Sequence, residues 1–202
     1  MPSDADPSPG ARERRSDAER NRQAILDAAL SALARRPDAA LDDIARSAGV
    51  TRTTVYRHFP NREALVSAVY AEAMTAVSGA VREARLAQGP VPAAFQRVVD
   101  AVLRIADEYM ILANGPAVDL NEPVLVAGYE EALEPIIALA ARGQATGELA
   151  TALPAWWLAD CLFALLLAAL ARESDGDLSR DQTPSFVLTS FWNGASTTNS
   201  GR

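Results

Sequence analysis

A chain of 202 residues with 49% hydrophobic residues is long enough for a small module and a larger second domain, each with a core. Its formal net charge of −7 argues against a general nucleic-acid-binding protein. However, residues 1–62 carry eleven Arg against nine acidic residues, whereas residues 63–202 carry eight against seventeen. The N-terminal part is therefore the part that suits a polyanion.

The chain contains one cysteine, Cys161, which excludes an intramolecular disulfide framework and suits a reducing cytoplasm. The N-terminus is polar and rich in Pro, Asp and Ser, without the pattern of a secretory signal. The longest apolar run, residues 161–171, is well short of the roughly 20 residues that span a bilayer. We therefore expect a soluble, cytoplasmic protein with no membrane partner.

Residues 1–15 lack hydrophobic periodicity, which predicts a disordered arm. The arginines at its end are either part of a solvated tail or contacts to DNA phosphates and the minor groove. Ser16 and Glu19 have the spacing of a capping box, so we expect the first helix to start near Asp17 and to end before Pro37.

Residues 41–60 have the pattern of two short helices joined by a tight turn. Apolar residues at i, i+3, i+4 and i+7 give the first helix one buried face, and Gly49 follows where a helix end favours a left-handed residue. Thr51 can cap the second helix, whose inner face carries Val55 and Phe59. The outer side chains are Arg, Thr, Tyr and His, which hydrogen-bond phosphates and base edges. This pattern predicts a helix-turn-helix.

A longer set of residues gives the segment a resemblance to a known family: Ile44-Ala45, Gly49-Val50, Thr51, Thr54-Val55-Tyr56-Arg57-His58-Phe59 and Pro60-Asn61-Arg62-Glu63-Ala64-Leu65. With these residues the segment resembles the DNA-binding domain of the TetR family of bacterial transcriptional regulators. One position departs from the family pattern, because Ala40 stands where Ser or Thr often caps the helix, a cap typically worth about 1 kcal/mol. Asp42 and Asp43 compensate in part through the helix dipole, although their charge is unfavourable near a phosphate.

The motif and the resemblance together nominate the residues that contact DNA: Thr51, Arg52, Thr53, Thr54, Tyr56, Arg57, His58 and Arg62. We expect four of them to contact phosphates: Thr54, Tyr56, His58 and Arg62. The side chains nearest the exposed ridge of the helix are expected to reach base edges: Arg52, Thr53 and Arg57. The DNA-binding domain is expected to occupy residues 16–62.

The rest of the chain, residues 63–196, shows only helical patterns, and residues 197–202 are expected to form a disordered tail. The expected helices run from Asn61 to about Leu86, Pro92 to Ala113, 121 to 128, Tyr129 to Gln144 with a kink or new start at Pro135, Pro154 to Arg172, and Arg180 to Asn193. The predicted fold is all-α with about nine helices. It combines an N-terminal three-helix helix-turn-helix domain with a C-terminal helical domain, which the resemblance implies is for ligand binding and dimerisation.

The helix expected over residues 154–172 is apolar almost all round, so it must be covered on every side. Pairing with the equivalent helix and the last helix of a second subunit would cover it, as the resemblance implies; a fully internal core helix is the alternative. The candidate interface residues are Trp156, Leu162, Leu166, Phe186 and Phe191. A twofold dimer would read a palindromic operator in successive major grooves.

The resemblance also implies a small-molecule pocket among the helices that follow the DNA-binding domain. Candidate lining residues are Phe95, Val99, Leu103, Tyr109, Met110, Leu125, Tyr129 and Trp156, and Tyr70, Met74 and Val77 of the preceding long helix could sense a ligand. Ordinary core packing is the alternative for each of them. Carboxylates are frequent in this half and would suit a cationic ligand if any faced inward, but most are expected at the surface.

Residues suited to catalysis or metal binding are scarce. The single histidine, His58, lies in the predicted recognition helix, and Cys161 has no second histidine to activate it and lies in an apolar run. The sequence has no phosphate-cradling glycine motif and no His/Cys zinc spacing, and residues 173–181 do not match a calcium loop. We therefore expect no enzymatic activity, cofactor or metal.

The sequence thus predicts a dimeric DNA-binding regulator of the bacterial cytoplasm, associated with the nucleoid when bound to DNA. Repression relieved when a small molecule releases a palindromic operator is the leading hypothesis. The alternative is a DNA-bound scaffold whose C-terminal domain binds a protein partner. A cavity of roughly 300 Å³ or more would favour the first hypothesis, and a filled core with an exposed apolar patch the second. An enzyme sharing the fold would need a polar cluster inside the pocket.

Overall fold

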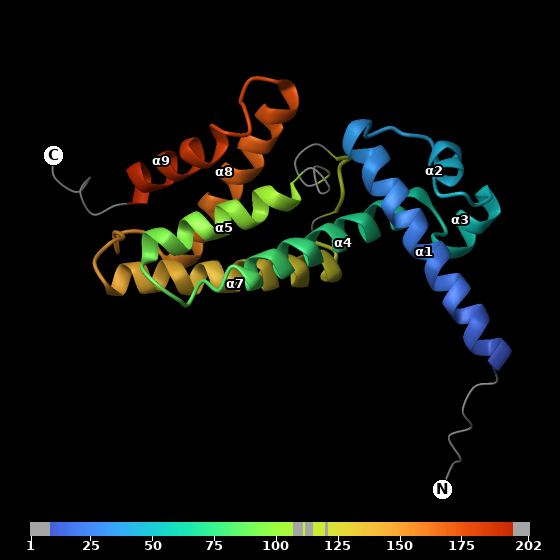
Figure 1. Ribbon diagram of the computed structural model, residues 1–202, viewed down its shortest axis with the longest axis horizontal. Helices are drawn as coiled ribbons and strands as arrows, with labels where there is room; N and C mark the ends of the chain where they lie inside the picture. The colour runs from blue at the N-terminus through green and yellow to red at the C-terminus, as the bar shows by residue number, and fades with distance from the viewer. Residues whose placement is uncertain (1–8, 107–110, 112–114, 120, 196–202) are drawn as a thin grey trace, which may run out of the picture.

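The computed structural model describes residues 9–106, 111, 115–119 and 121–195, with side chains from residue 16 onward. All elements in these ranges are helices: α1 (Pro9–Arg35), α2 (Leu41–Ser47), α3 (Arg52–His58), α4 (Arg62–Glu83), α5 (Val91–Ile105), α7 (Pro123–Ala145), α8 (Ala155–Asp175) and α9 (Thr183–Ala195). The predicted all-α class is confirmed, with eight helices in the described part of the chain against about nine expected. The helices α1 to α3 gather around one end of α4, which continues beside α7 in the C-terminal group (Figure 1).

The helices α1, α2 and α3 and the first half of α4 share one hydrophobic core. Its largest fully buried side chains are Ile25, Leu26, Leu33, Ile44, Val55 and Leu65. Gly49 has a φ of +69°, as expected for the residue that ends the first helix of the motif. Thr51 caps α3 by accepting a hydrogen bond from the backbone N–H of Thr54 at 3.2 Å, whereas Ala40 gives α2 no side-chain cap. The predicted helix-turn-helix geometry is confirmed.

The start of α1 differs from the prediction. The helix begins at Pro9, well before the expected start near Asp17, so Ser16 lies inside the helix and does not cap it. Residues 9–15, which were expected to belong to a disordered arm, are therefore helical, and residues 1–8 lie outside the described part of the chain. Ala, Glu and Arg are strong helix formers, and Pro suits the first position of a helix. The helix α1 can therefore extend toward the N-terminus beyond the residues whose apolar side chains are buried.

The C-terminal group of helices has a second core, in which α5 packs against α4, α7 and α9. Phe95 of α5 is fully buried. The centre of its ring lies 4.7 Å from the ring centre of Phe191 and 5.5 Å from that of Trp192. The described part of α5 ends at Ile105, so most of the expected extension to Ala113 lies outside the described residues. The last helix starts at Thr183, later than the expected Arg180.

One continuous helix, α7, replaces the two expected over residues 121–144 and passes through Pro135. Proline in a helix removes one backbone hydrogen bond and crowds the preceding turn. Buried residues on both sides of it, including Leu125, Leu133, Ile136 and Leu139, hold α7 against α4 and α8. Tertiary packing of this apolar face therefore overrides the local signal to end the helix.

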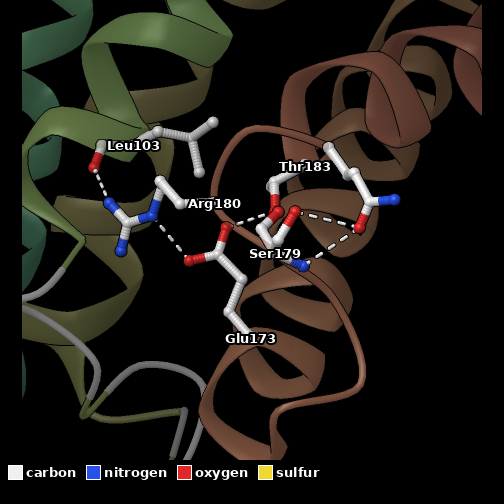
Figure 2. A network of polar contacts seen from close by, with 6 residues as sticks. Leu103, Glu173, Ser179, Arg180 and Thr183 are labelled. Atoms are coloured by element: carbon white, nitrogen blue, oxygen red, sulfur yellow. Dashed lines mark hydrogen bonds and ion pairs between the residues drawn. The ribbon is translucent and has the colours of Figure 1, made fainter.

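A polar network fixes the turn between α8 and α9 against the end of α5 (Figure 2). The helix α8 ends at Gly176, whose φ is +81°. The guanidinium of Arg180 donates to the Glu173 carboxylate at 2.6 Å and to the backbone oxygen of Leu103 at 2.9 Å. The Glu173 carboxylate also accepts from the hydroxyl of the fully buried Thr183. The charged residues of this loop thus have a structural role.

Candidate DNA-binding surface and effector cavity

The recognition helix α3 turns its apolar side inward. Val55 and Phe59 are buried, and the side chains between them face solvent or the domain edge. Of the residues expected to contact DNA, five are exposed and two are half-buried within this segment: Thr51, Arg52, Thr53, Tyr56 and Arg57 in the first group, and Thr54 and His58 in the second. The structure therefore places seven of the eight predicted residues on α3 and its N-cap, while Arg62 begins α4.

Arg52, at the start of α3, is held by two neighbours. One nitrogen, Nη1, lies 3.3 Å from the Asp42 carboxylate of α2, and the other, Nη2, donates to the Tyr56 hydroxyl at 3.3 Å. The guanidinium carbon also lies 5.4 Å from the centre of the Tyr56 ring, within the range of a cation–π contact. The bond to Tyr56 and the charge of Asp42 raise the pKa of Arg52, which remains fully charged.

The two acidic residues of α2 are paired with arginines of the same domain. Asp43 lies 2.9 Å from Arg46 and 3.3 Å from Arg36, and Asp42 pairs with Arg52. These exposed pairs add little stability, but they offset the negative charge that the sequence places beside the DNA-binding surface.

Arg62 makes two hydrogen bonds to the protein backbone that the sequence motif did not predict. Its Nη1 donates to the carbonyl oxygen of Ala39 at 2.7 Å, and its Nη2 donates to that of Pro37 at 2.6 Å. The guanidinium therefore ties the start of α4 to the loop between α1 and α2. Both acceptors are backbone oxygens distant in sequence, so no local pattern could have revealed them.

His58 is half-buried at the end of α3. Its Nε2 atom is buried and has no hydrogen-bond partner among the described residues. Burial, followed by the positive charges of Arg57 and Arg22, lowers the pKa of the imidazole below its ordinary value. The ring is therefore neutral at pH 7, and a contact to a phosphate would have to come from Nδ1.

A cavity of about 590 Å³ lies among α4, α7 and α8. Its walls are Tyr70 and Met74 of α4, Leu125, Val126, Tyr129 and Glu130 of α7, and Asp160, Phe163, Ala164 and Leu167 of α8. The volume lies within the range of small-molecule sites and exceeds the 300 Å³ or so taken above as the criterion.

The charged groups of this cavity are acidic. The Tyr129 hydroxyl donates to the Asp160 carboxylate at 2.9 Å, and the Tyr129 ring meets the Phe163 ring edge-on at 5.5 Å. Burial and the bond to Asp160 raise the pKa of Tyr129 to about 12, so the phenol keeps its proton. Glu130 is the second carboxylate of the wall, and the lining residues include no Arg, Lys or His. A ligand in this cavity would meet aromatic faces and negative charge.

The residues expected to line a pocket fall into four groups. Leu125 and Tyr129 line the cavity. In contrast, the side chains expected from α5 are buried in the C-terminal core away from it: Phe95, Val99 and Leu103. Trp156 is 53% exposed at the start of α8, and Tyr109 and Met110 lie outside the described residues. Of the possible ligand sensors on α4, Tyr70 and Met74 line the cavity, whereas Val77 is buried beyond it.

The cavity residues of α8 were missed because this helix is apolar almost all round. Periodicity then distinguishes no single face, and apart from Trp156, a pocket candidate, the helix was assigned mainly to dimerisation. The carboxylate of Asp160 was the available signal, since an acidic residue interrupting an apolar helix needs a polar or solvated environment.

The expected dimer residues also divide. Leu162, Leu166 and Phe191 are buried in the protomer's own core, whereas Trp156 and Phe186 are 53% and 58% exposed. A separate apolar groove of about 480 Å³ runs between α8 and α9, lined by Leu153, Leu158, Cys161, Ala164, Leu165, Ala168, Ser190, Phe191, Gly194 and Ala195. The outward face of α8 therefore carries Cys161, Leu165 and Ala168. Burial, followed by the charge of Asp160, raises the pKa of the Cys161 thiol.

Comparison with known proteins identifies the family. The family described as "Bacterial regulatory proteins, tetR family" matches residues 25–69. The HTH-type transcriptional repressor LfrR of Mycolicibacterium smegmatis is 34% identical over 176 residues, covering 87% of this chain and 90% of that protein. The chain belongs to the TetR family. It is a DNA-binding transcriptional regulator, and the family's members are regulators, not enzymes.

Solved structures of TetR-family proteins extend the likeness over the whole fold. The structure of LfrR from Mycobacterium smegmatis in complex with proflavine has a TM-score of 0.72 at 34% identity, covering 87% of this chain and 96% of that one. A putative TetR regulator from Shewanella sp. PV-4 has a TM-score of 0.70 at 25% identity, covering 88% and 98%. By length and composition α4 and α8 are apolar enough to cross a membrane, but core helices of soluble proteins meet the same criterion, and the match to transcriptional regulators implies a soluble cytoplasmic protein.

Proposed function

We propose that this protein is a dimeric repressor that a small-molecule effector, bound among α4, α7 and α8, releases from a palindromic operator. The observation that supports this proposal most is that two residues lining the cavity also belong to the hydrophobic core of the DNA-binding helices. Tyr70 and Leu125 line the cavity and also belong to the hydrophobic cluster that α1, α2 and α3 share with the first half of α4. An effector that moves either side chain therefore acts on the domain that reads DNA.

Two hydrogen bonds strengthen this connection. The Tyr70 hydroxyl donates to the backbone oxygen of Pro116 at 2.8 Å, and the buried Ser67 hydroxyl donates to the Glu122 carboxylate. Both bonds join α4 to the segment that leads into α7. A ligand that separated α4 from α7 would shift α4, and with it the spacing of the two recognition helices in a dimer. Because coupling is reciprocal, operator DNA must weaken effector binding by the same factor.

The chemistry of the cavity favours an effector that is an apolar aromatic cation. Asp160 and Glu130 supply negative charge, and Tyr70, Tyr129 and Phe163 supply ring faces or edges. Aromatic rings attract cations, and a carboxylate at the edge of an apolar site gains from a positive partner. The same preference is consistent with the binding of proflavine, a flat aromatic cation, by the LfrR relative. A cavity of this size also favours an effector over the scaffold hypothesis, which called for a filled core.

The outward face of α8 and α9 supports the dimer. Trp156, Trp157 and Phe186 of these helices are each about half exposed, and the apolar groove that contains Leu165 is lined mainly by the same two helices. A second copy of the chain would cover this apolar surface and place two recognition helices for one palindrome.

The decisive experiment is a calorimetric titration of the full-length protein with tetraphenylphosphonium, an aromatic cation that does not intercalate DNA. Triphenylphosphine oxide, which has three of the same rings but no net charge, is the matched control ligand. We expect the cation to bind more tightly, and Asp160→Asn to remove most of that preference. Repeating the titration with a selected operator duplex tests release, for which the expected loss of affinity is about 5- to 150-fold. Equal cation affinity with and without DNA would exclude effector release.

A further inference from the structure

One acidic residue of the DNA-binding domain has a charge that is unfavourable near DNA phosphates, and yet it contacts a residue that we expect to bind a base edge. Asp42 lies in the first turn of α2, with its side chain 56% exposed, and its carboxylate is 3.3 Å from Nη1 of Arg52. Near phosphates such a charge lowers affinity for every DNA sequence. The contact that it makes with Arg52 therefore calls for a function other than general DNA affinity.

The Arg52 guanidinium is fixed from three directions. Asp42 contacts one terminal nitrogen, the Tyr56 hydroxyl accepts from the other at 3.3 Å, and the Tyr56 ring lies under the guanidinium carbon at 5.4 Å. A guanidinium has five N–H donors, and two of them are used in the described part of the chain. Three therefore remain for acceptors on DNA. Each contact alone is weak in water, but together they select one orientation of a long and flexible side chain.

We propose that Asp42 is a positioning residue for DNA recognition, holding Arg52 with Tyr56 in the orientation that reads one base pair of each operator half-site. The proposal rests on the assignment of Arg52 to a base edge. Ordering the arginine before DNA binds removes an entropy cost that the correct and incorrect sequences would otherwise share. More importantly, it prevents the guanidinium from turning to a phosphate or to another base, so discrimination depends on the carboxylate.

The neighbouring residue supplies a matched control. Asp43 has the same charge and lies in the same turn of α2, but it pairs with Arg46 and Arg36 and not with Arg52. Asp42→Asn and Asp43→Asn therefore remove the same charge from nearly the same place. Both variants lose one favourable interaction with the dipole of α2, and both remove repulsion from phosphates. Only the first removes the ion pair with Arg52.

The test is selection from a library of duplexes with about 20 randomised base pairs, enough for two half-sites one helical turn apart. Full-length wild-type protein, Asp42→Asn, Asp43→Asn, Asp42→Glu and Arg52→Ala are each carried through the selection. Arg52→Ala identifies the position at which the arginine reads the DNA. At that position the wild type should discriminate by about 5- to 150-fold, and Asp42→Asn should lower this ratio by about 3-fold or more.

Asp43→Asn should retain the wild-type preference at that position, and Asp42→Glu, which keeps the carboxylate, should retain most of it. Binding of a scrambled duplex should tighten equally for the two asparagine variants. An unchanged preference in Asp42→Asn, an equal loss in Asp43→Asn, or a sharper preference in Asp42→Asn would each overturn the proposal. A selected motif that is unchanged in Arg52→Ala would also overturn the proposal, because Arg52 would then read no base pair. If the wild type selects no motif, sequence-specific binding itself fails, a different outcome from failure of the positioning proposal alone.

Discussion

Arg62 shows how a charged side chain next to a DNA-binding motif can act on the protein's own backbone. Two N–H groups of its guanidinium satisfy the carbonyl oxygens of Pro37 and Ala39, which lie in the loop before α2. Because α2 has no side-chain cap, this loop is the part of the motif with the weakest local support. The arginine thus holds the loop before α2 against the start of α4.

Replacing Arg62 by Ala should lower the free energy of unfolding by about 2 kcal/mol, since two charge-assisted hydrogen bonds are lost, of which the one to Ala39 is partly buried. Urea denaturation followed by circular dichroism measures the change. Arg57→Ala is the control, because Arg57 is exposed on α3 and its loss should alter stability by less than about 0.5 kcal/mol. Equal stability of the two variants would contradict a structural role for Arg62.

His58 gives the domain a pH dependence of predictable sign. Burial, Arg57 and Arg22 lower its pKa in the folded protein, with Glu19 opposing them, so the unfolded chain binds a proton more readily than the folded chain. The stabilising contribution is complete above the unfolded pKa of about 6.5 and declines as the pH falls below it. The unfolding free energy of the wild type should therefore decrease more than that of His58→Gln between pH 7.5 and pH 5.5, in parallel urea titrations. Parallel decreases in both proteins would contradict this assignment.

At the scale of elements, the sequence predicted helices well where local chemistry and packing agree. The α2–turn–α3 unit has a periodic apolar face, a glycine with φ of +69° and a threonine cap, and each of these signals is local. The break expected between residues 128 and 129 was wrong, and α7 continues through Pro135, because the burial of Leu133 and Ile136 is a tertiary effect. The cavity was predicted only in part, because α8 is apolar on all faces and its division into a core side, a cavity side and an outer side depends on its neighbours.

Tyr70 offers a test of how α4 transmits effector binding. Tyr70→Phe keeps the ring that lines the cavity but removes the hydrogen bond to the Pro116 oxygen. Without DNA, tetraphenylphosphonium affinity should stay within about 2-fold of the wild type, whereas the weakening of binding by operator DNA should be smaller. Paired calorimetric titrations measure both quantities. Wild-type coupling in this variant would show that the Pro116 bond does not transmit the signal, and Met74→Leu, which keeps the bond, is the control.

For the whole molecule, neighbouring leucines of α8 separate association from folding. Leu165 lines the outer groove, whereas Leu166 is 1% exposed in the protomer's core. Leu165→Glu should give a folded monomer in sedimentation, because an unpaired charge in an apolar interface costs several kcal/mol. Leu166→Glu should instead prevent stable folding. A wild type that sediments as a monomer at micromolar concentration, or a Leu165→Glu variant that remains a dimer, would contradict the proposed interface.

The cavity draws its charged wall from α7 and α8, while its connection to the DNA-binding core runs through Tyr70 and Leu125. Under the proposed function, selectivity for the effector and transmission of its binding are therefore carried by different side chains. Substitutions at Glu130 or Asp160 should change which compound binds without altering operator recognition, whereas Ala164 also lines the groove of the proposed dimer interface. The input of the proposed regulator can then be replaced while its output is retained.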